Sequence, residues 1–149
     1  MKGSCLCGVI GYEVDQLDMP ISHCHCRTCR KAHAAAFVSS AGVMREHFRW
    51  LKGLEKLSAF ESSPGKLRHF CSVCGSHLVA ERLAQPHVIL RVATLDEDPG
   101  IKPTMHIWCS HSAPWLEDST RKGRRPKQRD HRPSRVAPGA LPQGASGDD

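Results

Sequence analysis

Long apolar runs are absent from this 149-residue sequence, and aromatic side chains make up only 5% of it. Without a stretch of about 18 apolar residues, the sequence offers no transmembrane helix. The first residues, Met1 to Cys5, lack the apolar segment of a secretory signal, so we expect a cytoplasmic protein without a membrane partner. Because aromatic residues are scarce, a hydrophobic core must be built mainly from aliphatic side chains.

The positive charge is concentrated toward the C-terminal end. Residues 1–118 contain 13 basic and 12 acidic side chains and contribute +1 to a net charge of +6. Residues 119–149 contribute the other +5 and consist mainly of Arg, Lys, Pro, Gly, Ser and Gln. Such a composition cannot bury enough apolar surface to offset its ordering entropy. We therefore predict one folded domain over residues 1–118 and a basic, disordered tail over residues 119–149.

A near-neutral domain offers no basic face for docking on nucleic acid, so we regard nucleic-acid binding as the less favoured hypothesis. The tail is then either a solvated segment or an arm that contacts an anionic partner.

Short β-branched segments separated by glycine and proline predict a mainly β domain. The expected strands cover residues 5–14, 36–43, 48–51, 57–60, 66–70 and 88–92, with a turn at residues 62–65 and one short helix at residues 28–36. We expect Trp50 and Phe60 to be core residues. The expected strands are short, and apolar and polar side chains alternate only weakly along them. Another constraint must therefore hold the sheets together.

Seven of the eight cysteines fall in three tight groups. Cys5 and Cys7 form a C-x-C motif, and Cys71 and Cys74 form a C-x-x-C motif followed by Gly75. In a reducing compartment such pairs indicate metal binding rather than disulfides, and a C-x-C disulfide would be strained. The two pairs supply the four ligands of a tetrahedral zinc, which would contribute on the order of 10 kcal/mol to folding. We predict a structural zinc on these four cysteines.

The third group has the spacing C-x-C-x-x-C and contains Cys24, Cys26 and Cys29. Three thiolates can hold zinc and leave one coordination position open, as catalytic zinc sites do. The alternative is a closed site, completed by Cys109 or by a nearby histidine. The candidate histidines are His23, His25 and His33. His25 is the weakest of them, because consecutive side chains on a strand point to opposite faces.

An open tri-cysteine zinc suits a soft ligand, such as the sulfur of an incoming thiol. Zinc lowers the pKa of a bound thiol, so the favoured chemistry is making or breaking a carbon–sulfur bond on a small thiol. Arg27, Arg30 and Lys31 lie beside the motif. They either bind a substrate carboxylate and offset the negative charge of the thiolates, or form a solvated face.

Together, the three cysteine motifs resemble the glutathione-dependent formaldehyde-activating enzyme family, which also includes centromere protein V. The motifs read Gly3-Ser4-Cys5-Leu6-Cys7-Gly8, His23-Cys24-His25-Cys26-Arg27-Thr28-Cys29-Arg30 and Phe70-Cys71-Ser72-Val73-Cys74-Gly75-Ser76. Further similarity at residues 93–96, 103–108 and 113–115 extends the resemblance over about residues 3–116.

The resemblance implies a β-tent fold of small antiparallel sheets around the structural zinc. It also implies a second zinc on the tri-cysteine group, where the sulfur of glutathione binds. The implied reaction is the condensation of formaldehyde with glutathione to S-(hydroxymethyl)glutathione, which is classed as a carbon–sulfur lyase reaction.

The sequence therefore predicts a zinc-dependent carbon–sulfur lyase that acts on an adduct of glutathione, or of a similar small thiol, with an aldehyde. Cys24, Cys26 and Cys29 are the predicted catalytic residues. The predicted metal ligands are these three together with Cys5, Cys7, Cys71 and Cys74. Two alternatives stay open: a non-catalytic zinc-binding module that uses the tail to contact an anionic partner, and a carrier of thiol adducts without turnover. The role of Cys109 and the oligomeric state also stay open.

Overall fold

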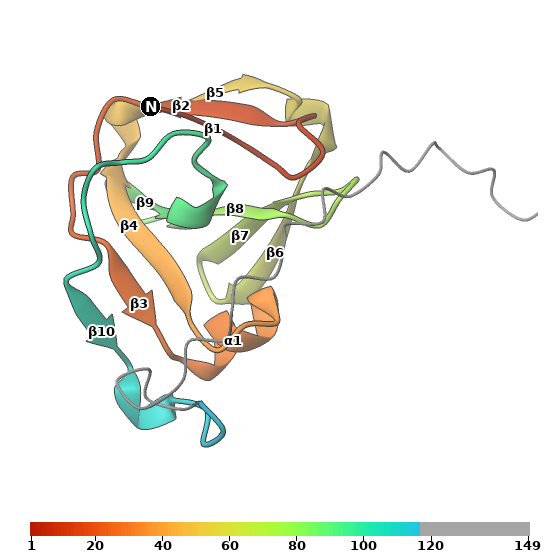
Figure 1. Cartoon of the computed structure of the whole chain (residues 1–149). Helices are drawn as coiled ribbons and strands as arrows, with labels where there is room; N and C mark the ends of the chain where they lie inside the picture. The colour runs from red at the N-terminus through yellow and green to blue at the C-terminus, as the bar shows by residue number, and fades with distance from the viewer. Residues whose placement is uncertain (117–149) are drawn as a thin grey trace, which may run out of the picture. The chain divides into compact units, whose positions relative to one another are not determined.

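The computed structural model describes residues 1–116, which form two β-sheets and one short α-helix (Figure 1). The smaller sheet has the strand order β1-β2-β5 and is antiparallel; its strands are Lys2–Ser4, Gly11–Val14 and Phe48–Lys52. The larger sheet has seven strands in the order β10-β3-β4-β9-β8-β7-β6. In that order, its strands are Met105–Ile107, Ser22–Cys24, Val38–Met44, His87–Arg91, His77–Arg82, Lys66–Cys71 and Leu57–Ser63.

Every strand pair of the larger sheet is antiparallel except β10 with β3, which run parallel. Helix α1 (Arg27–His33) connects β3 to β4. Four 3-10 helices complete the described chain: η1 (Arg45–His47), η2 (Leu54–Lys56), η3 (Val92–Thr94) and η4 (Cys109–His111). The predicted mainly β fold is confirmed, with the parallel β10 strand as an addition to the antiparallel pattern.

The hydrophobic core draws on both sheets. Its buried side chains are Ile10, Tyr12, Val14, Val43, Leu78, Val79, Val88 and Leu90, joined by Cys5 and Cys71. Tyr12 is fully buried, and its hydroxyl lies 2.8 Å from Thr94 Oγ1, so the polar end of the ring is paired inside the core. Trp50 packs against this core as predicted. The prediction for Phe60 is wrong: its side chain is 64% exposed, on strand β6 at the edge of the larger sheet.

Two predicted elements differ from the structure in ways that matter for the cysteines. The sequence predicts a strand that begins at residue 5, but residues 5–10 form a turn in which Gly8 has φ 74° and its N–H donates to Cys5 O at 2.9 Å. The helix predicted to reach residue 36 ends at His33, because Ala34 takes a left-handed conformation (φ 48°) and turns the chain toward β4. Helix-forming alanines alone therefore do not extend the helix.

Within residues 1–116, none of the helices has the length and apolar character needed to span a bilayer. The tail predicted over residues 119–149 lies outside the described residues, so its boundary and its disorder stay predictions.

The turn at Gly53 provides a test of how closely the chain packs beside the Cys5–Cys7 turn. Gly53 has φ 78°, and a Cβ there would meet Val9 O and lie 2.9 Å from Ile10 Cα. Gly65 has a similar φ of 70°, but a Cβ there would meet nothing within 4 Å. We expect Gly65→Ala to lower the free energy of unfolding by about 1–2 kcal/mol, the cost of a left-handed alanine. Gly53→Ala should cost a further ~1–3 kcal/mol, because the backbone must also move. Urea unfolding measures both; equal losses would contradict the close contact.

Candidate functional site

The first cysteine group gathers four sulfur atoms at the edge of the core. The Sγ atoms of Cys5, Cys7, Cys71 and Cys74 all lie within 4.8 Å of one another. The Cys5–Cys7 pair is 3.5 Å apart and the Cys7–Cys71 pair is 3.9 Å apart, and the cysteines are free thiols. With Zn–S bonds of about 2.3 Å, two sulfurs of a tetrahedral site are about 3.8 Å apart. The spacing thus fits a tetrahedral metal site and does not fit disulfides.

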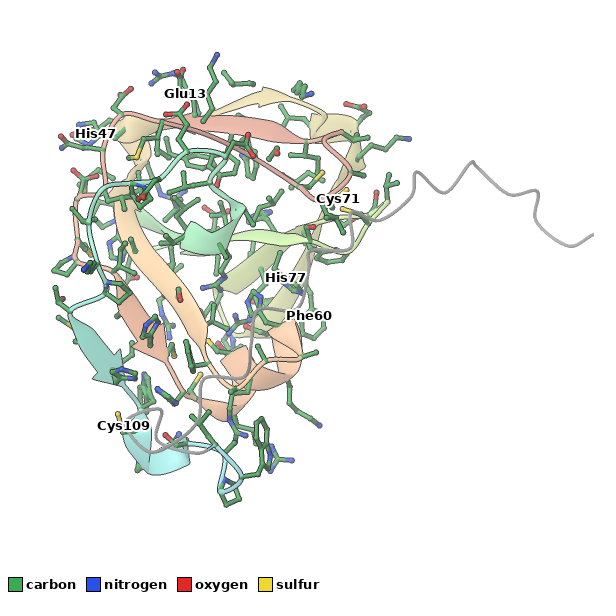
Figure 2. All side chains as sticks on the ribbon, in the orientation of Figure 1. Glu13, His47, Phe60, Cys71, His77 and Cys109 are labelled. Carbon is green, nitrogen blue, oxygen red and sulfur yellow. The ribbon has the colours of Figure 1, made fainter. Side chains whose placement is uncertain are left out.

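Two turns present these sulfurs to each other. The Cys5–Cys7 turn is held by the Ile10 amide, which donates to Cys5 Sγ at 3.3 Å. Cys71 ends β7, and the Cys71–Cys74 turn closes through an amide hydrogen bond from Gly75, at φ 75°, to the Cys71 carbonyl (2.8 Å). Figure 2 shows Cys71 below the loop that joins β1 to β2. The C-x-C motif therefore presents its sulfurs from a turn and not, as the predicted strand implies, from one face of a strand.

The second group brings together Cys24, Cys26 and Cys29, whose Sγ atoms also lie within 4.8 Å of one another. Cys24 is the last residue of β3, and Cys26 is the N-cap of α1. The Cys26 sulfur accepts a hydrogen bond from the Cys29 amide at 3.4 Å. The strand end and the first helical turn thus converge on one point.

No fourth cysteine, histidine or carboxylate of residues 1–116 joins this group. Cys109 is exposed on η4 and is not a member. The three candidate histidines have other neighbours. The His25 Nε2 atom lies 2.8 Å from His106 Nδ1, His23 Nδ1 lies 2.9 Å from Ser39 Oγ, and the His33 ring is 4.5 Å from the His77 ring. Each alternative for a closed site thus lacks support from the described geometry.

Two buried arginines lie beside the second group, and the sequence motifs did not point to either. Arg68 on β7 and Arg91 on β9 are only 3% and 4% exposed. Both guanidinium Nη atoms of Arg68 lie about 4 Å from Cys29 Sγ, at 4.0 and 3.9 Å. The hydrogen bond from Cys24 does most to lower the pKa of the Cys29 thiol, and the charges of Arg91 and Arg68 lower it further, against the effect of burial.

These arginines have no acidic partner within residues 1–116, and the Nε of each lacks a hydrogen-bond partner there. A buried cation is costly unless an anion compensates it. The thiolates of the second cysteine group can supply that charge, since burial lowers the pKa of Arg91 and the charges of Cys29, Cys24 and Cys26 raise it. An anionic ligand could supply it as well. The sequence gives one signal for this buried pair: each of the two predicted strands, at residues 66–70 and 88–92, contains an arginine.

A cavity of about 740 Å³ opens beside the three cysteines. Its charged lining residues are all basic: Arg27, Lys66, Arg68, Arg82 and Arg91. No aspartate or glutamate of the described chain lines it. The pKa of Lys66 is lowered by burial and then by the charges of Arg68 and Arg82, so these cations crowd one another. Such a cavity favours an anion.

The three basic residues beside the C-x-C-x-x-C motif lie in different places. Arg27 lines this cavity. The Nε of Arg30 instead donates to the His25 carbonyl at 3.2 Å, which helps to fix the loop between β3 and α1. Lys31 lines a neighbouring cavity. Among the aromatic residues, Trp108 lines the cavity of the cysteines, where its ring stacks on His111 with 5.7 Å between centroids.

The comparisons with known proteins agree with the cysteine geometry. The family model described as glutathione-dependent formaldehyde-activating enzyme matches residues 1–111. The crystal structure of a Rhodobacter sphaeroides protein is similar, with a TM-score of 0.58 and 25% identity; the match covers 71% of this chain and 99% of that chain. No curated protein matches the chain. The family match contains both cysteine groups and confirms the resemblance seen in the sequence: the chain belongs to the glutathione-dependent formaldehyde-activating enzyme family.

Proposed function

We propose that this protein binds two zinc ions and makes or breaks a carbon–sulfur bond between glutathione and an aldehyde at the tri-cysteine group. The observation that carries the proposal is the placement of three converging sulfurs on the wall of a cavity whose charged lining is entirely basic. Membership of the family supports glutathione and formaldehyde as the reactants. Cysteines that are grouped for metal binding and not paired in disulfides support a reducing, cytoplasmic location.

Both sulfur groups fit zinc better than magnesium or calcium, which prefer oxygen ligands. Cys5, Cys7, Cys71 and Cys74 would hold a closed structural ion, and Cys24, Cys26 and Cys29 would hold an ion with an open position. When bound there, zinc supplies the Lewis acidity that keeps a substrate thiol deprotonated near neutral pH.

The basic residues of the cavity bind and orient the thiol substrate. Glutathione carries two carboxylates, and guanidinium groups bind carboxylates through paired hydrogen bonds. Lys66 and Arg82 are less buried than Arg68 and Arg91, so they are the better anchors for a ligand that enters from solvent. Arg68 and Arg91 offset the negative charge of the cysteines.

The reaction needs no oxidant or reductant. The glutathione sulfur forms a bond to the carbonyl carbon, the carbonyl π bond opens onto oxygen, and the thiol proton ends on that oxygen. The reverse reaction breaks the same carbon–sulfur bond. His87 and His111 line the cavity, and an imidazole in this place can take the proton from sulfur and return it to oxygen.

The division of labour between the two cysteine groups can be tested by native mass spectrometry of the reduced protein. We expect two zinc ions per chain and a glutathione adduct. Cys5→Ala should prevent folding, because it removes a ligand from the site at the core edge. Cys26→Ala should leave a folded protein with one zinc ion and no adduct.

Cys109→Ala is the matched control, because it removes an exposed thiol that belongs to neither group. It should keep both ions and the adduct. Equal unfolding of the Cys5→Ala and Cys26→Ala variants would contradict the assignment. If the adduct forms but the rate of aldehyde addition does not exceed that in solution, the protein is a carrier and not an enzyme.

Recognition of the carboxylates can be tested with Arg82→Gln. Losing one charged hydrogen bond should weaken glutathione binding about tenfold. The diethyl ester of glutathione has no carboxylate, so its dissociation constant should hardly change. Isothermal titration of the zinc-loaded protein measures both ligands, and Lys52→Gln, a change outside the cavity lining, serves as the control. Equal weakening of both ligands would show that Arg82 does not bind a carboxylate.

A further inference from the structure

A second cavity, of about 700 Å³, lies along helix α1. We propose that it holds an apolar substituent on the sulfur of the thiol adduct, so that the preferred aldehyde is larger and more hydrophobic than formaldehyde. This inference rests on the proposed function and names the class of its second substrate.

The walls of this second cavity are largely apolar. Ala32 of α1 lies on its helical side, and Phe60 of β6 and Phe70 of β7 lie on its strand side, with His77 at the start of β8. Figure 2 shows Phe60 and His77 close together above the helix. The His77 ring is 5.6 Å from the Phe70 ring, and burial is the main cause that lowers the pKa of His77, which favours the neutral imidazole.

The two cavities share residues. Arg27, Thr28, Ser62 and Arg68 line both of them, so the cysteine cavity and the apolar cavity adjoin at these side chains. In a bound adduct, the sulfur would lie at the cysteines and the carboxylates at the basic residues. The aldehyde-derived group on the sulfur would then point toward Phe60 and Phe70.

The sizes and charges of the cavities favour this occupant over formaldehyde alone. The single carbon of formaldehyde is comparable in volume with one water molecule, about 30 Å³, and fills little of the second cavity. Phe60 is 64% exposed although it lines a concave apolar wall, so a bound aromatic or alkyl group would cover it. Arg27 and Lys31 also line this cavity, and their charge matches an adduct that carries carboxylates besides its apolar group.

The test compares three ligands on the zinc-loaded, full-length protein by isothermal titration: glutathione, S-methylglutathione and S-benzylglutathione. The two thioethers have the same carboxylates and differ only in the substituent. Burying a phenyl group should make S-benzylglutathione bind about tenfold or more tightly than S-methylglutathione.

Two variants test whether the second cavity causes this gain in affinity. Phe60→Ala removes part of the wall at an exposed position, and Ala32→Trp fills the cavity from the helix. Both should abolish the preference for the benzyl compound and leave the S-methylglutathione affinity unchanged. Leu54→Ala is the control, since Leu54 is 57% exposed and lines neither cavity.

The different failures can be told apart. If glutathione binds but the benzyl group brings no gain, or if the gain survives in both variants, this inference is wrong and the proposed function stands. If none of the three ligands binds, both proposals fall together. As a kinetic check, addition of glutathione to phenylacetaldehyde should be accelerated more than addition to formaldehyde, and Phe60→Ala should remove that difference.

Discussion

The contact between two cysteine turns is the constraint on which the rest of this structure depends. Cys7 and Cys71 are 64 residues apart in the sequence, and their sulfurs are 3.9 Å apart in space. The first turn belongs to the smaller sheet and the second to the larger one. Cys5 and Cys71 are at the same time part of the core. A metal held there would fix the two sheets against each other, which strands of three to seven residues do weakly by themselves.

Charge balance gives the second group its chemical character. Three thiolates and one zinc ion would carry a net charge of −1, whereas Arg68 and Arg91 add +2 beside them. The arginines would be costly to bury without the thiolates, and the thiolates would repel one another without the cations. With zinc bound, the centre would be slightly positive, and it adjoins a cavity with further basic residues. This balance favours an anionic thiol over a neutral one.

The sequence predicted which cysteines lie together far better than it predicted the surroundings of the cysteines. The spacing within each motif is a local property of the chain, and the need of a tetrahedral metal for four ligands suggested that the two pairs of cysteines come together. By contrast, strands β1, β3, β8 and β10 were not predicted. Three of them have only three residues, and pairing with other segments holds them in the sheets. The alanines after His33 favour a longer helix, but the chain has to turn there to enter β4. Phe60 was assigned to the core because of its residue type. Its exposure follows from its place on an edge strand, and the order of strands in a sheet cannot be read from a single segment.

The short helix α1 explains why one substrate could contact both cavities. Seven helical residues span only about 10 Å. The N-terminal turn of the helix carries Cys26 and Cys29 into the cysteine cavity, and Lys31 and Ala32 follow within one turn on the wall of the apolar cavity. Because successive helical residues are rotated by about 100°, the same element can present sulfur to one side and a small apolar side chain to the other. Since Ala32 is small, space is left where a larger side chain would close the cavity. The helix would thus set the distance between the sulfur of the substrate and the group bound in the second cavity, so that a few residues on one helical turn would select the size of the substrate.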